Sequence, residues 1–199
     1  MGRRGRIWLG VSPEIYYYNS ARREAAGELA GQLGGLIQEE MLRRHKKKLV
    51  FLCIGTDRST GDSLGPLIGY KLKQSGRRGS LVFGTLERPV HAMNLEHYVQ
   101  VLKCGYADAL VVAVDASVGD ENHVGYVTLG RGALKPGLGV YKELKEVGDL
   151  FITGIVAGAG SYDPMMLQSI RLSLVMQLAD CISAGIGLVE NFCLNAASV

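Results

Sequence analysis

The chain has 199 residues, of which 47% are hydrophobic and 21% charged, so it is long enough to bury a sizeable core as one compact domain. Its 27 glycines follow no repeat, which excludes collagen-like, linker and disordered chains. The formal net charge of +3 is too small to require a nucleic-acid partner. The 4 cysteines form no CxxC pair, so we expect no disulfide framework and no zinc site, and a reduced, cytoplasmic compartment is the simplest interpretation.

The N-terminal part of the chain contains an aromatic patch followed by a helical pattern. Residues 1–19, with Tyr16, Tyr17 and Tyr18, are expected to form an irregular arm. Apolar residues at helical spacing predict one helix over residues 20–44, with Ser20 as its N-cap, and a basic turn ends this extra segment at residue 48. We interpret the basic run as a solvated surface rather than a polyanion site. Residues 20–199 are expected to form a single α/β domain.

From residue 49 onward, strand and helix patterns alternate. This alternation predicts βαβ units and a mostly parallel sheet with helices on both faces. No export signal is expected at the N-terminus, and Arg171 and Asp180 favour a buried helix over a membrane span in the apolar stretch around them. The expected strands are residues 49–54, 80–86, 109–114, 123–129 (exposed) and 151–157, and the expected helices are 63–74, 94–103 with Asn94 as cap, and 164–184, opened by Pro164, with a loop over 130–149.

Two loops are candidates for carrying chemistry. Doubly wound sheets bind ligands beyond the carboxyl ends of their strands, where the strand order reverses. The loop of residues 55–66 follows the first of these buried strands, and residues 115–120 follow the third. If the strand order begins 2-1-3, Asp62 and Asp115 meet across this point.

Two carboxylates that lie close together can act as a pair in catalysis or in metal binding. Their repulsion separates the two pKa values, so that one group holds a proton while the other is ionised. Such a pair activates water and protonates a leaving amine, or binds a divalent metal through oxygen. The structural alternatives are that Asp62 is an ordinary N-cap and that Asp115 only bonds loop amides.

Nucleotide binding is a further alternative, because a Gly-containing loop between a strand and a helix can hold phosphate. However, Gly55, Gly61 and Gly65 do not form a GxGxxG pattern, and no Walker lysine is present. Glu87 is placed where dinucleotide folds carry a ribose-binding acid, yet the acids Asp57 and Asp62 lie in the loop that would face pyrophosphate.

The remaining candidates are assigned supporting roles. The four histidines show no metal-ligand spacing, and only His91 and His123 lie near the predicted crevice. No GxSxG motif is present and no cysteine lies at the crevice, so serine and cysteine nucleophiles are poorly supported. The residues expected to shape the loop, orient the carboxylates or bind substrate are Thr56, Asp57, Ser59, Thr60, Gly61, Ser117 and His91.

Long stretches of the chain resemble a known family. FLCIGTDRSTGDSLGPLIG, GTLERPVHAMNLE, VDASVG, LKPGLGVYKELKEVGDLFITGIVAG and LQSIRLSLVMQLAD are similar to the YyaC-like sporulation proteins of endospore-forming bacteria, which are described as spore proteases. The resemblance covers roughly residues 49–187. It implies a role in a sporulating cell or spore.

Two shorter motifs are distantly similar to the germination protease. TGDSLGP resembles its TPDALGP-type loop, and VVAVDAS resembles the segment of its second catalytic aspartate. The resemblance implies that Asp62 and Asp115 occupy the positions of its two essential aspartates. Hydrogenase maturation proteases share this architecture and bind nickel there, but their histidine ligand has no clear match in this chain. The resemblance also implies a three-layer α/β/α, phosphorylase/hydrolase-like fold.

Two functions are carried forward. The first is a germination-protease-like peptidase (a hydrolase) that cleaves a sporulation or spore protein. One of Asp62 and Asp115 would act as the general base and the other as the general acid. Amides at the start of the 63–74 helix would stabilise the oxyanion. The second is a non-catalytic protein that binds a peptide or small ligand on the same scaffold. We expect a protein or peptide partner, no nucleic acid, no membrane, no metal and no cofactor. The glycine-rich helix and the tyrosine patch also suggest a homo-oligomer.

Overall fold

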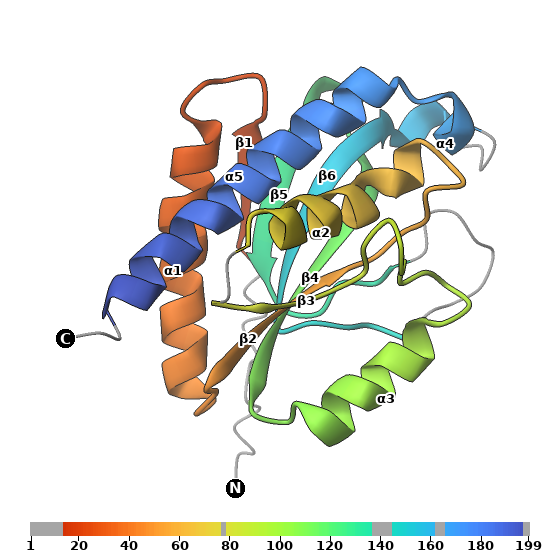
Figure 1. The fold of residues 1–199 in the computed structure, drawn as a ribbon. Helices are drawn as coiled ribbons and strands as arrows, with labels where there is room; N and C mark the ends of the chain where they lie inside the picture. The colour runs from red at the N-terminus through yellow and green to blue at the C-terminus, as the bar shows by residue number, and fades with distance from the viewer. Residues whose placement is uncertain (1–13, 77–78, 137–144, 162–165, 197–199) are drawn as a thin grey trace, which may run out of the picture.

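A computed structural model describes residues 14–76, 79–136, 145–161 and 166–196, which are built around one six-stranded sheet (Figure 1). The strand order is β1-β5-β6-β4-β2-β3, and β5 runs antiparallel to both of its neighbours while β6, β4, β2 and β3 pair in parallel. The strands are β1 (Ile15–Asn19), β2 (Lys48–Cys53), β3 (Leu81–Phe83), β4 (Ala109–Gly119), β5 (Tyr126–Arg131) and β6 (Leu150–Gly158).

Helices cover both faces of the sheet, as Figure 1 shows. α1 (Ala25–Arg43), α2 (Leu64–Gln74) and α5 (Leu172–Ala196) pack together on one face, with α5 in the middle. α3 (Leu95–Gly105) covers the other face over β2 and β4, and the short α4 (Met166–Ser169) precedes α5. The predicted three-layer α/β/α fold with a mostly parallel sheet is therefore confirmed.

The central strand β2 explains the continuous apolar run from residue 49. Phe51 and Cys53 contribute to the core under α1, α2 and α5, whereas Val50 and Leu52 contribute to the core under α3. Successive side chains of a strand point to opposite faces. A strand covered on both faces is therefore apolar at every position.

The predicted N-terminal arm is wrong over its last five residues. Residues 15–19 form the edge strand β1, which pairs antiparallel with β5 and places Tyr18, 9% exposed, against the core. The predicted helix also begins later, at Ala25, with Glu24 at the N-cap position. Ser20 is not a cap: its hydroxyl donates to the Gly125 carbonyl at 2.5 Å and ties β1 to the start of β5.

Three further predictions differ from the structure. The strand expected to be exposed over 123–129 lies at Tyr126–Arg131 and is largely buried, because it is an interior strand whose Val127 and Leu129 side chains belong to the core under α1 and α5. The Asn94 side chain does not cap α3: its oxygen accepts from the His91 N–H and its amide donates to the Pro89 carbonyl. The last helix starts at Leu172 instead of Pro164, which lies outside the described residues.

Helix α5 is long and apolar enough, over Leu172–Glu190, to cross a membrane by length and composition. In the structure it is the central helix on its face of the sheet, packed against both α1 and α2. Its residues Val175, Leu178, Ile182 and Ile186 are fully buried in the core. The apolar composition of α5 is thus explained by its position as a core helix.

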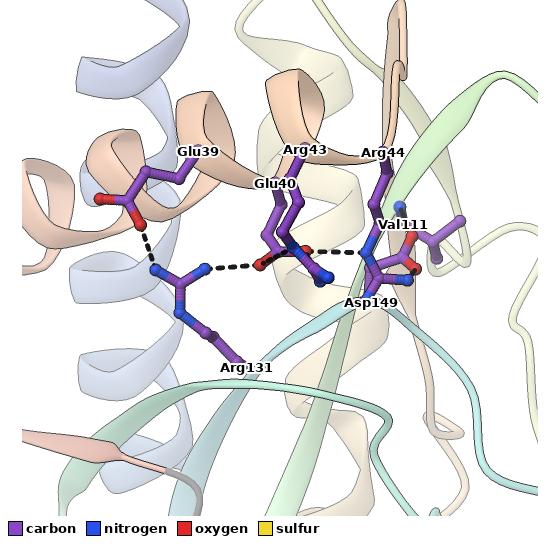
Figure 2. A network of polar contacts seen from close by, with 7 residues as sticks. All are labelled: Glu39, Glu40, Arg43, Arg44, Val111, Arg131 and Asp149. Carbon is purple, nitrogen blue, oxygen red and sulfur yellow. Dashed lines mark hydrogen bonds and ion pairs between the residues drawn. The ribbon is translucent and has the colours of Figure 1, made fainter.

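A buried acid joins α1 to the amino end of the sheet (Figure 2). Glu40 is only 2% exposed, and its carboxylate accepts hydrogen bonds from Arg43, Arg44 and Arg131. Burial by itself raises the pKa of Glu40, but the bonds from these arginines lower it to about 2. Arg44 continues the network to Asp149, whose second oxygen accepts from the Val111 N–H in β4.

We expect Glu40→Gln to lower the free energy of unfolding by about 3 kcal/mol near neutral pH, because it removes a buried charge that three arginines face. A lowered carboxylate pKa stabilises the fold above the unfolded-state pKa, so this loss should shrink as the pH falls from about 4.5 toward 2. Urea unfolding at several pH values measures both effects. Glu39→Gln is the control: this exposed acid also pairs with Arg131 and should change stability by less than about 1 kcal/mol.

Candidate functional site

The candidate site lies at the carboxyl ends of two neighbouring strands. β2 pairs in parallel with β4 from Lys48↔Ala109 to Cys53↔Val114, and β3 lies on the other side of β2. The structure confirms the predicted 2-1-3 strand order, on which the expected meeting of Asp62 and Asp115 depended. One detail differs: β4 continues through Gly119, so Asp115 lies within the strand and not in a loop after it.

The loop after β2 is held tightly against the sheet by glycine. Gly55 has a φ of 136°, and a Cβ at this position would lie 2.0 Å from the Asp62 carbonyl oxygen. A Cβ on Gly65 would lie 2.0 Å from the Ile54 carbonyl oxygen, so the first turn of α2 rests directly on the end of β2. These glycines are therefore explained by close backbone packing. They also bring the short 3-10 turn that carries Asp62, Gly61–Ser63, back over the strand ends.

Asp62 is partly buried and held from within its own loop. The Thr56 N–H donates to its carboxylate at 3.0 Å and also to its main-chain carbonyl at 3.1 Å. The structural alternative for Asp62 does not hold, because its side chain caps no helix. Burial raises the pKa of Asp62 to about 6, against a smaller lowering by the Thr56 N–H. Near neutral pH this group is mostly ionised, and it gains a proton in weak acid.

Asp115 is more deeply placed, at 4% exposure, and its carboxylate accepts from the Ala116 N–H at 2.8 Å. Burial, followed by the negative charge of Asp62, holds the pKa of Asp115 well above its ordinary value. The two carboxyl groups are thus close enough to interact electrically. Repulsion of this kind disfavours ionisation of both acids at once.

The other predicted loop residues lie around Asp62, but in different ways. Thr56 accepts the Arg58 N–H through its hydroxyl, and the Ser59 and Thr60 carbonyls accept the N–H groups of Asp62 and Ser63. A Cβ on Gly61 would lie 3.0 Å from Leu167, so this glycine lets α4 approach the turn. Asp57 is exposed. Their assigned roles in orienting carboxylates or binding substrate stay predictions.

His91 and Ser117 lie on opposite sides of this loop. Val90, the residue before His91, accepts the Gly55 N–H at 2.8 Å, which places His91 beside the loop at the end of the sheet. The imidazole Nδ1 accepts from the Met93 N–H. Ser117, two residues beyond Asp115 on the same face of β4, shares a hydrogen bond of 2.9 Å with the Thr153 hydroxyl.

The sequence patterns did not predict that two threonines lie next to Asp115. Thr153 in β6 is the direct strand partner of Asp115, and Thr128 in β5 is the partner of Thr153. Their hydroxyls are 2.6 Å apart and both residues are buried. Together with Ser117 they form a row of hydroxyl groups beside the buried acid. The available signal was a single threonine within each of two apolar strands, LFITGIVAG and YVTLGR.

The ligand chemistry available at this site is that of two carboxylates. Among the described residues, no group of three or more histidine, cysteine, aspartate or glutamate side chains is arranged to hold a metal ion. The arrangement suits proton transfer, because burial raises the pKa of both acids and the charge of Asp62 raises that of Asp115 further.

The raised pKa values predict a stability cost at neutral pH. Between about pH 4 and the folded-state pKa, the folded protein holds protons that the unfolded chain has released, so the free energy of unfolding falls as pH rises. Asp62→Asn should therefore stabilise the protein by about 2 kcal/mol at neutral pH, and Asp115→Asn should also stabilise it. Both gains should fade as the pH approaches about 4, as measured by urea unfolding. Destabilisation by Asp115→Asn at neutral pH would contradict a raised pKa.

Ser59 allows a second test within the same loop. Its hydroxyl oxygen is buried without a hydrogen-bond partner, whereas the Ser63 hydroxyl donates to the Thr60 carbonyl at 2.7 Å. An unsatisfied buried hydroxyl is costly, so Ser59→Ala should raise the free energy of unfolding by about 1 kcal/mol. The matched variant Ser63→Ala should lower it by about 1 kcal/mol. Equal losses in both variants would show that the Ser59 hydroxyl is satisfied in solution.

Comparisons with known proteins place the chain in a family. It is 44% identical over 161 residues to "Uncharacterized protein YyaC" of Bacillus subtilis (strain 168), covering 81% of this chain and 78% of that protein, which confirms the predicted YyaC-like resemblance. A crystal structure of the NiFe hydrogenase maturation protease HycI from Thermococcus kodakarensis KOD1 shows 18% identity and a TM-score of 0.38, over 69% of this chain and 93% of that one. That likeness is too low to bear on function. Residues 18–185 match the family described as "Protein of unknown function (DUF1256)", and the chain belongs to this family.

Proposed function

We propose that this protein is a peptidase that hydrolyses a peptide bond with Asp62 as general base and Asp115 as general acid. The observation that carries the proposal is the meeting of these two carboxyl groups at the ends of β2 and β4, with the pKa of the buried Asp115 raised by burial and by the charge of Asp62. An ionised and a protonated acid side by side can act as the general base and the general acid of amide hydrolysis.

Each proton in the reaction has a donor and an acceptor. The ionised Asp62 takes a proton from a water molecule while the water oxygen attacks the peptide carbonyl carbon. Asp115 gives its proton to the amide nitrogen as the carbon–nitrogen bond breaks. The products are a carboxylic acid and an amine, and the enzyme is left with Asp62 protonated and Asp115 ionised. Exchange of one proton with solvent restores the starting state.

The burial of the pair supports this division of roles. Asp62 is the more accessible acid and its pKa of about 6 suits a base that is ionised near neutral pH. Asp115, at 4% exposure, is the better proton store, because its charged form is disfavoured by burial and by Asp62. A sporulation or spore protein is the proposed substrate class, on the basis of the sequence resemblance, and a sporulating cell or spore cytoplasm is the proposed compartment.

The acid pair predicts the effect of matched asparagine variants on cleavage of proteins in a spore extract. Asp62→Asn and Asp115→Asn should each lower the rate by about 10²–10⁴-fold, because each removes one proton-transfer group and keeps its size. Asp180→Asn is the control, since this exposed acid lies on α5 and is not among the candidate site residues. The wild-type kcat/KM should rise with pH through about 6 as Asp62 ionises, and fall again when Asp115 loses its proton.

Three outcomes would overturn the proposal of a peptidase that uses Asp62 and Asp115 as base and acid. Cleavage at the wild-type rate by both Asp62→Asn and Asp115→Asn would show that neither acid takes part. A wild-type protein that cuts nothing in the extract but retains a peptide or spore protein, with Asp62→Asn reducing that retention, would establish the binding function instead. Loss of cleavage with a chelator and its recovery with a divalent ion would assign the chemistry to a metal.

A further inference from the structure

One edge of the sheet is formed by β1, which no described strand covers on its outer side. β1 pairs with β5 through residues Ile15–Asn19, and no other strand of the described residues lies beyond it. The outward main-chain N–H and C=O groups of an edge strand are a template for another strand. Natural proteins block such edges with lysine, proline, a bulge or a very short strand.

β1 carries none of these blocking features. Its sequence, IYYYN, contains no charge and no proline, and its pairing with β5 is regular from Ile15↔Gly130 to Asn19↔Tyr126. The opposite edge differs, because β3 has only three residues. The two outward-pointing apolar side chains of β1 on one face, Ile15 and Tyr17, are 41% and 49% exposed.

The strand that fits β1 best is a second copy of β1. Antiparallel pairing about a two-fold axis at Tyr17 places Tyr17 opposite its own copy on one face, and Tyr16 opposite Tyr18 twice on the other. All three central positions are then aromatic–aromatic pairs, with Cβ atoms about 5 Å apart. Tyr16 and Tyr18 already pack on the core under α1, so the pairing continues that core across the axis.

The surroundings of Tyr17 provide an aromatic surface for the partner. The His123 ring lies 5.0 Å from the Tyr17 ring and 5.0 Å from the Tyr126 ring, measured between centroids. Aromatic clusters of this kind are enriched at the centres of protein interfaces. A second Tyr17, arriving beside the first, would contact this cluster.

The charged residues at the two ends of β1 would face opposite charges across the two-fold axis at Tyr17. The exposed Glu14 precedes the strand, and the exposed Arg22 and Arg23 follow it. Antiparallel pairing about Tyr17 brings Glu14 of one copy toward the arginines of the other, twice by symmetry. Arg22 pairs with Glu24 and Glu28 within its own chain, whereas Arg23 pairs with no acid among the described residues.

We propose that the protein forms a two-fold homodimer in which β1 pairs antiparallel with β1 of a second copy, centred on Tyr17. The two sheets then become one continuous sheet of twelve strands. The proposal does not depend on the peptidase activity. The acid pair lies away from the interface, because Asp115 is in β4 and Asp62 follows β2, and both strands are on the other side of β6 from β1.

Sedimentation velocity over a wide concentration range tests the dimer. Wild type should be a dimer, and Tyr17→Lys should weaken it by about tenfold or more, because two like charges then face each other across the axis. Glu14→Arg should weaken the dimer, and the added change Arg23→Glu should restore it. Met93→Lys is the control, because this fully projecting side chain follows β3 at the opposite edge and should leave the dimer unchanged. Circular dichroism confirms that each variant is folded.

Cross-linking tests the geometry of the pairing. In a background that carries Cys104→Ser, which removes the exposed thiol among the described side chains, and Cys193→Ser, Tyr17→Cys should form a disulfide-linked dimer on oxidation, and Met93→Cys should not. A wild-type protein that is monomeric throughout the concentration range would overturn the proposal. A dimer that survives Tyr17→Lys, or that cross-links equally through residue 93, would overturn it as well, since another surface would then hold the copies together.

Discussion

The parallel pairing of β2 with β4 is the interaction on which the rest of the structure depends. It sets two strands, separated by more than fifty residues of chain, in the middle of the sheet, with apolar side chains toward both helical layers. It also brings the ends of these strands together. Asp115 lies in one of them and Asp62 in the turn that folds back over the other, so a single register fixes both the core and the acid pair.

The buried acids at the two ends of the sheet have opposite electrostatic surroundings. At the amino end, Glu40 is surrounded by three arginines, and their hydrogen bonds offset the cost of its burial (Figure 2). At the carboxyl end, no arginine or lysine of the described residues compensates Asp115, and the charge of Asp62 raises its pKa further than burial alone does. The first arrangement stabilises the fold, whereas the second is costly. An electrostatic cost of this kind is typical of sites where a group must gain and lose a proton.

Glycine makes the acid pair geometrically feasible. The turn that carries Asp62 can lie over β2 only because the backbone at Gly55 and Gly65 approaches carbonyl oxygens more closely than a Cβ would allow. The same glycines invited a phosphate-binding interpretation when only their spacing was known. In the structure these glycines let the loop after β2 and the first turn of α2 pack closely on neighbouring main-chain atoms. The loop also presents a carboxylate, which repels phosphate. The Thr128, Thr153 and Ser117 hydroxyls complete a polar region within an otherwise apolar sheet.

Local patterns in the sequence determined the fold class, the central strands and the two candidate acids. Continuous apolar runs such as residues 49–54 report burial on both faces, and motifs such as TGDSLGP report a strand-to-helix loop, because both depend on neighbours along the chain. The N-terminal tyrosines could not be placed in this way: β1 becomes a strand only by pairing with residues more than a hundred positions away. The burial of Glu40 among arginines, the adjacency of Thr153 to Asp115 and the burial that raises the pKa of both acids likewise arise from contacts between distant segments. Only the tertiary structure decides these features, because the free energy of a charge or a strand edge depends on what is packed against it.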